Sequence, residues 1–145
     1  MNRIPESEFI LNEDGSIYHL HLHPDQIGDL IFTVGDPDRV SQVSKHFDSL
    51  DFQNSKREFV THTGRLGGRK VSAMSTGMGT DNVEIFMNEL DALVNIDLEH
   101  RTIKKELTQL QIVRLGTSGA IQPDIPVGSL LLSEKAIGID TLMNF

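Results

Sequence analysis

The sequence has no cysteine and no tryptophan, and it contains a single tyrosine. Without cysteine there can be no disulfide framework and no thiolate metal site, which fits a reducing compartment. No apolar stretch approaches the ~18 residues that would suggest a membrane span. The first residues, MNRIPE, lack the basic start and apolar run of a signal peptide. We therefore expect a cytoplasmic protein without a membrane partner.

Positive charge is also scarce, with 13 Lys and Arg residues against 21 Asp and Glu residues and a formal charge of −8 over 145 residues. A nucleic-acid surface needs an excess of Lys and Arg on one face, so no nucleic-acid partner is expected. A small anionic ligand is still compatible with this composition. At an effective dielectric of about 20, one charge pair 4 Å apart contributes roughly 4 kcal/mol, so two or three focused arginines dominate a pocket.

The hydrophobic pattern predicts short strands that alternate with helices. We expect strands over residues 30–34, 57–63, 70–75, 111–115 and 127–133, with a Gly67-Gly68 turn between the second and third. A short helix capped by Asp36 follows the first strand, and a longer one, capped by Thr80 or Asp81, spans residues 80–94. Residues 95–109 are interpreted as a solvated helical extension or a surface insertion. This order predicts an α/β sheet covered by helices.

In such sheets ligands bind beyond the carboxyl ends of the strands, which selects loops 35–39, 77–82 and 114–119. Gly35 allows close backbone approach and Arg39 offers a fork of donors, although a plain turn with a solvated Arg39 is an equal alternative. Arg114 is expected to be buried on an apolar strand and so to need an anionic partner. Hydroxyls of Thr117 and Ser118 could complete an anion pocket. The alternative is an internal pair of Arg114 with Asp or Glu.

Several common sites are not supported. The Gly77-Met78-Gly79 segment lacks the third glycine of a dinucleotide fingerprint, and no P-loop occurs. Ser75 and Ser118 have no identifiable His and Asp relay, so a serine hydrolase is not predicted.

His19, His21 and His23 alternate with Tyr18, Leu20 and Leu22. On a strand all three imidazoles would share one face, a spacing compatible with metal ligation. Because no further ligand is identifiable, a partly exposed histidine face is the favoured interpretation and no metal site is predicted from it.

Three blocks, taken together, resemble the nucleoside phosphorylase family that includes uridine phosphorylase and the hexameric purine nucleoside phosphorylases. They are residues 34–40 (VGDPDRV), residues 75–79 (STGMG) leading to 88–90 (NEL), and residues 114–123 (RLGTSGAIQP). Residues 56–59 (KREF) match between the first two blocks. The order and approximate spacing of the blocks also match, so the set is more specific than any one motif. The resemblance starts near His19, which leaves residues 1–18 as an N-terminal extension.

The resemblance implies a three-layer α/β/α phosphorylase fold with a mixed central sheet. The fold is expected to be incomplete here, because 145 residues would form only the N-terminal half of one domain. The implied reaction is phosphate-dependent cleavage of uridine to uracil and ribose 1-phosphate, by a pentosyltransferase of nucleoside catabolism and pyrimidine salvage. Alternatives are a purine nucleoside phosphorylase, a related nucleosidase that uses water, or a catalytically incomplete phosphate-binding half-domain. The isolated chain is expected to be inactive.

By position, the resemblance assigns phosphate binding to Gly35, Arg39, Arg114 and Thr117, with Arg114 also catalytic. Arg57 would reach the phosphate of a neighbouring subunit, and Thr117 would also contact the nucleoside. His19 would cross a dimer interface to the ribose 5′-hydroxyl. A homodimer is then the smallest unit with complete sites, usually assembled into hexamers.

No cofactor is implied beyond inorganic phosphate as a substrate and a possible potassium ion. In uridine phosphorylases that ion is held by positions that match Glu58, the backbone of Met78, and a serine. This chain has Asn82 where the family has the serine. The potassium site therefore stays open.

Overall fold

The computed structural model describes residues 3–137 of the chain. They form two compact units, which divide after Leu115. In the described part of the chain, no helix is both long enough and apolar enough to cross a membrane.

The first unit contains a five-stranded sheet with strand order β2-β3-β4-β1-β7. Its strands are β1 (Leu30–Val34), β2 (Ser49–Lys56), β3 (Phe59–Leu66), β4 (Arg69–Ser75) and β7 (Gln111–Arg114). β1 runs parallel to both β4 and β7, whereas β2, β3 and β4 pair antiparallel. The central sheet is therefore mixed, as predicted.

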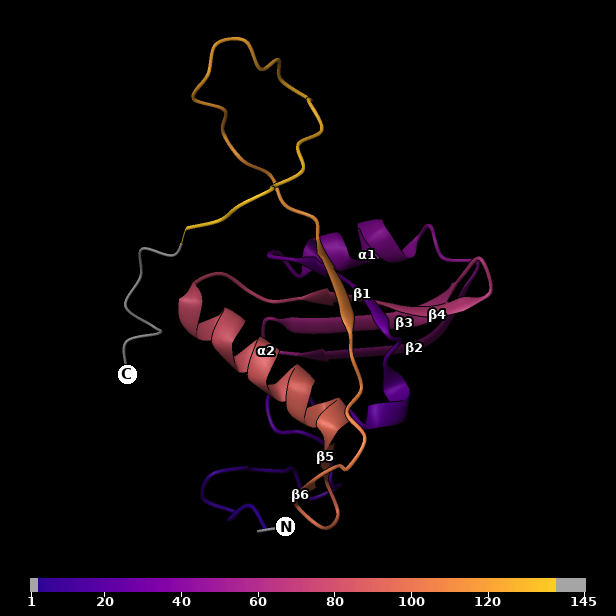
Figure 1. Cartoon of the computed structure of the whole chain (residues 1–145). Coiled ribbons are helices and arrows are strands. Elements are labelled where there is room, and N and C mark those ends of the chain that lie inside the picture. Colours follow the sequence, from indigo (N-terminus) through magenta and orange to yellow (C-terminus); the bar gives the residue numbers. More distant parts are fainter. Residues whose placement is uncertain (1–2, 138–145) are drawn as a thin grey trace. The chain divides into compact units, whose positions relative to one another are not determined.

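Two helices cover opposite faces of this sheet (Figure 1). α2 (Thr80–Asn95) contributes Phe86, Leu90 and Leu93 to a core that also holds Ile31 and Met74. α1 (Asp38–Ser44) instead packs through Val40 against Val34 of β1 and Ala73 of β4. Because successive strand residues point to opposite faces, Met74 and Ala73 mark the two sides of the sheet. The result is the expected three-layer α/β/α arrangement.

The starts of the helices differ in detail from the prediction. α1 begins at Asp38, and the Asp36 carboxylate accepts the backbone N–H of Asp38 at 3.0 Å. α2 begins after Gly79, and no side chain caps it. The predicted cap at Thr80 or Asp81 is wrong because Gly79, with φ of +96°, makes the turn one residue earlier.

The N-terminal residues before β1 are part of the packed structure. Ile17, Leu20 and Leu22 are fully buried in the same core as α2, and a short 3-10 helix, η1 (Pro24–Gln26), follows. His19, His21 and His23 are partly or fully exposed, as predicted, but they and the buried leucines lie in a turn and not on a strand. His21 has φ of +53°, so the backbone does not alternate there.

Three further segments depart from the prediction. The sequence pattern missed β2, because its half-buried positions include the polar residues Asn54 and Lys56 and so give no apolar alternation. Of the two interpretations of residues 95–109, the helical extension is wrong, because α2 ends at Asn95 and the short strands β5 (Ile96–Asp97) and β6 (Thr102–Ile103) follow. The surface insertion stays a prediction. The strand predicted at 127–133 is absent, and Leu130 and Leu132 are almost fully exposed. A strand forms by hydrogen bonding to a neighbouring strand, and no residue from 116 to 137 takes part in such a pair.

His62 on β3 gives a pH-dependent contribution to stability. Its Nδ1 lies 2.7 Å from the Ser44 hydroxyl, and burial lowers the pKa of the imidazole below its ordinary value of 6.5. The unfolded chain then binds the proton more readily, so this contribution is present above pH 6.5 and is lost as the pH falls through the lowered folded pKa.

When the pH is lowered from about 7.5 to about 5, we therefore expect the melting temperature of His62→Asn to fall less than that of the wild type. Thermal unfolding at both pH values measures the difference. His46→Asn, at an exposed position, serves as the control and should follow the wild type. Equal pH dependence in wild type and His62→Asn would contradict the assignment.

Candidate functional site

The carboxyl ends of three parallel strands meet at one edge of the sheet. In the strand register Val34 lies beside Ser75, and Thr33 lies beside Arg114. Two backbone hydrogen bonds continue this alignment past the strands, from Thr76 N–H to the Val34 carbonyl at 2.9 Å and from Leu115 N–H to the Thr33 carbonyl at 2.8 Å. The starts of the three loops selected from the sequence therefore lie together.

Arg39 and Arg114 converge on Gly35 from two different elements. A terminal nitrogen of Arg39 lies 3.8 Å from the point that a Cβ on Gly35 would occupy, and one of Arg114 lies 3.9 Å from the same point. The Gly77 carbonyl oxygen lies 3.7 Å from it. Because Gly35 has no side chain, there is room beside its backbone for a small group that touches both guanidinium groups.

The two arginines have no acidic partner within residues 3–137, where no carboxylate oxygen lies within 4.0 Å of either side chain. Two positive charges held around one point repel each other unless an anion joins them. The alternative of an internal Arg114 pair is thus not observed. The prediction that Arg114 is buried is wrong, because β7 is the edge strand and all four of its residues are exposed.

Two further residues are expected to contact phosphate, Arg57 that of a neighbouring subunit and Thr117 that of its own. Arg57 lies in the turn between β2 and β3, where it is exposed and has φ of +55°. Its neighbour Glu58 packs against Gly77, with Cγ 2.9 Å from the position of a Cβ on that glycine. Thr117 and Ser118 belong to the second compact unit, which begins at Gly116. Their expected contacts with phosphate and nucleoside stay predictions.

The residues of the possible potassium site surround Gly77. Asn82 Nδ2 donates a hydrogen bond to the Met78 carbonyl at 3.0 Å, and Glu58 lies against the same glycine. A hard cation needs oxygen ligands that point toward one centre. Here Asn82 presents its amide nitrogen to the carbonyl that would have to bind the ion, and the amide would have to turn over to offer its oxygen instead. The ion stays a prediction from the resemblance alone.

If this internal hydrogen bond takes the place of a cation, replacing KCl by NaCl at equal ionic strength should leave the melting temperature unchanged. A bound ion would stabilise the fold by RT ln(1 + c/Kd), where c is the concentration of K⁺, and so raise the melting temperature in KCl. Thermal unfolding in the two salts measures this, with Asn82→Ser as the comparison variant. A potassium-specific rise in the wild-type melting temperature would show that the ion binds.

His19 is held by a residue that the sequence patterns did not reveal. Its Nδ1 lies 2.6 Å from Oε1 of Glu89, which is 70 residues away on α2. Glu89 falls within the 88–90 block of the resemblance, but no local motif distinguishes it from the other acidic residues of the helix. Among the described residues, no group of three His, Asp or Glu side chains could hold a metal ion.

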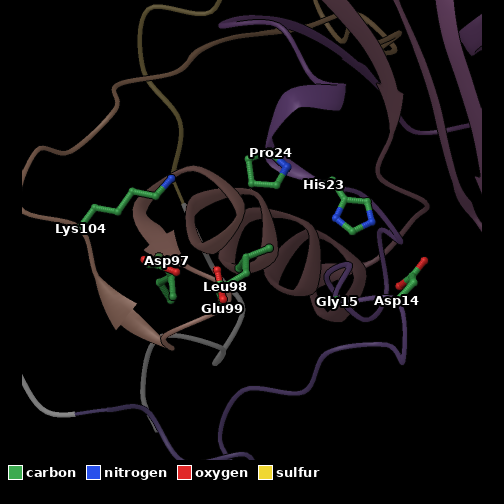
Figure 2. Close-up of a pocket in the computed structure, with 9 residues that line it drawn as sticks. Asp14, Gly15, His23, Pro24, Asp97, Leu98, Glu99 and Lys104 are labelled. Atoms are coloured by element: carbon green, nitrogen blue, oxygen red, sulfur yellow. The ribbon is translucent and has the colours of Figure 1, made fainter.

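A separate cavity of about 490 Å³ lies beside the β5–β6 hairpin (Figure 2). Carboxylates of Asp14, Asp97 and Glu99 line it together with Lys104, whose Nζ donates to the Val94 carbonyl at 2.9 Å. Three carboxylates and one ammonium group give the lining a net negative charge, which repels an anion. This cavity contains none of the residues predicted to bind phosphate, so it does not compete with the Gly35 site.

The mixed sheet between two helical layers defines an α/β protein, and Arg39 and Arg114 lie together at the carboxyl edge of its parallel strands. Residues 29–144 match the model of the phosphorylase superfamily. The chain therefore belongs to that superfamily.

Individual relatives agree with this assignment. The chain is 31% identical over 128 residues to a uridine phosphorylase of Thermococcus kodakarensis, covering 88% of the chain and 41% of the relative. It is 30% identical to a DeoD-type purine nucleoside phosphorylase of Streptococcus suis, covering 87% of the chain and 48% of the relative. The chain thus spans less than half the length of these relatives.

A solved structure shares the fold. The crystal structure of a Trypanosoma brucei nucleoside phosphorylase, described as showing uridine phosphorylase activity, superposes with a TM-score of 0.73 at 34% identity. The match covers 81% of this chain and 41% of that one. A Phytophthora capsici uridine phosphorylase gives a TM-score of 0.68 at 26% identity, covering 86% of this chain and 39% of that one.

Proposed function

We propose that this chain provides the phosphate-binding half of a nucleoside phosphorylase that cleaves uridine. The observation that carries the proposal is the convergence of Arg39 and Arg114 on Gly35 without an acidic partner among residues 3–137. Relatives named uridine phosphorylase support uridine as the nucleoside. The relatives named purine nucleoside phosphorylase keep a purine nucleoside as the second candidate.

In the proposed reaction a phosphate oxygen attacks the anomeric carbon of the sugar. The new C–O bond forms as the C–N bond breaks, and the base leaves with the bonding electrons and then takes up a proton. The sugar becomes cation-like in the transition state, so a nearby phosphate both stabilises that charge and supplies the nucleophile. Arg39 and Arg114 contribute by fixing the position and orientation of the phosphate.

Other parts of the proposal rest on the resemblance. Thr117 would contact phosphate and nucleoside, Arg57 would reach the phosphate of a second subunit, and His19 would reach the nucleoside of a second subunit. This makes a homodimer the smallest complete unit, with a hexamer as the full assembly. No residue for base recognition is identified in this chain, so we expect the 145 residues alone to bind phosphate without turning over nucleoside. The cytoplasmic location also stays a prediction.

Titration of phosphate with the chain in a chloride buffer of constant ionic strength, followed by ³¹P NMR, tests whether the chain binds phosphate. We expect saturable binding of phosphate that the excess of chloride does not prevent. A parallel assay offers uridine or inosine with and without phosphate. Release of base without phosphate would favour a nucleosidase and contradict the proposal, and so would the absence of phosphate binding.

A further inference from the structure

Glu89 holds the turn that carries His19 through several hydrogen bonds. Its carboxylate accepts the backbone N–H of His19 at 3.0 and 2.9 Å and the backbone N–H of Leu20 at 2.8 Å. The turn is closed by a further bond from His21 N–H to the Ile17 carbonyl at 3.0 Å. The Glu89 side chain is only 14% exposed, and the adjacent Leu20 is fully buried. The backbone at His19 is therefore fixed against α2.

The same carboxylate also decides which ring nitrogen of His19 carries a proton. An ionised carboxylate only accepts hydrogen bonds, so the nitrogen that faces Glu89 at 2.6 Å, Nδ1, has to be the donor. In the neutral ring Nε2 then has no proton and is a hydrogen-bond acceptor. Among the described residues no hydrogen bond to Nε2 occurs.

The ring is also restrained from the side. Tyr18 packs edge-on against it, with centroids 4.8 Å apart and planes at 84°. Lys56 Nζ lies 4.8 Å from the centre of the Tyr18 ring and restrains it in turn. The His19 side chain remains 31% exposed, and it borders a cavity of about 230 Å³ that is also lined by Phe9 and Asn88. An accessible acceptor nitrogen is thus presented on a rigid support.

We propose that Glu89 is a positioning residue that keeps His19 as the Nδ1–H tautomer, so that Nε2 accepts a hydrogen bond from a hydroxyl of the sugar. The identity of the sugar rests on the proposed function. The tautomer and its dependence on Glu89 follow from this chain's own contacts. This arrangement resembles other sites in which a carboxylate orients a histidine through the ring nitrogen remote from the ligand.

Long-range ¹H–¹⁵N NMR of the imidazole, at about pH 8 where an imidazole is ordinarily neutral, tests the proposal. We expect protonated Nδ1 and bare Nε2 for His19 in the wild type. Glu89→Ala should raise the population with a proton on Nε2, because no carboxylate then accepts a hydrogen bond from Nδ1. Glu84→Ala, exposed on the same helix, is the matched control and should change nothing.

A wild-type ring protonated on Nε2, or a tautomer unaffected by Glu89→Ala, would overturn the proposal. If Glu89→Ala fails to fold, the tautomer of His19 in the wild type still decides the question. In the complete enzyme, addition of uridine, and not of uracil, should move the Nε2 resonance of His19, and no movement would refute the role toward the sugar. The phosphate titration is independent of these results. Absence of phosphate binding by the wild type would refute the proposed function. A His19 ring protonated on Nε2 in a wild type that binds phosphate would refute only the role of Glu89.

Discussion

Replacing Arg114 by alanine is expected to weaken phosphate binding about 10- to 100-fold. A hydrogen bond to a charged group contributes about 1.5–3 kcal/mol, and each 1.4 kcal/mol is about a factor of ten in Kd. In the complete enzyme the loss should be larger, about 10²–10³ in rate, because the guanidinium also acts on the transition state. Isothermal titration of the chain with inorganic phosphate measures the first effect.

The matched control is Arg65→Ala, which removes the same charge from an exposed residue near the end of β3. It should retain wild-type affinity, because Arg65 pairs with Lys70 near the start of β4, away from the carboxyl ends of the parallel strands. Gly35→Ala offers an independent check, since its methyl group would lie at ordinary contact distances of 3.7–3.9 Å from Gly77, Arg39 and Arg114. It should fold normally and bind phosphate weakly. Unchanged phosphate affinity in Arg114→Ala would contradict the site.

Replacing Phe86 by alanine should destabilise the first unit by about 3–5 kcal/mol, the usual cost of removing a large aromatic side chain from a core. Phe86 is fully buried and belongs to the cluster that joins α2 to the sheet and to the N-terminal residues. Since small domains are stable by only about 5–15 kcal/mol, this loss would remove a large share of the free energy of unfolding. Urea unfolding followed by circular dichroism measures the free energy.

Met87→Ala is the control for this effect, because the next residue of the same helix is 45% exposed. Alanine is also a better helix former than methionine, so we expect a change of less than about 1 kcal/mol. Similar losses for the two variants would show that α2 does not pack on the sheet as described.

The parts of the fold that were predicted carry strong local patterns. The continuous apolar run at 30–34 and the helical spacing of Val83, Phe86 and Leu90 identify a buried strand and an amphipathic helix by themselves. From these, the rule for strand ends predicted that the loops after β1, β4 and β7 would meet. The convergence of Arg39 and Arg114 is a direct consequence of that topology.

The parts that were not predicted depend on contacts between distant residues. β2 is an exposed antiparallel strand that is set by its pairing with β3, where Gly64 approaches the Ser49 carbonyl too closely for any side chain. The role of Glu89 depends on a contact across 70 residues, which no local spacing encodes. Arg114 was expected to be buried because its strand is apolar, but the position of β7 at the sheet edge leaves it exposed.

The most direct test of the account is phosphate titration of the double variant Arg39→Ala/Arg114→Ala. Its charge-matched partner is Arg65→Ala/Lys105→Ala, at two exposed positions. The account predicts that the first variant loses measurable phosphate binding, while the second binds as the wild type does. Equal phosphate affinity in both double variants would show that the arginines beside Gly35 do not form the anion site.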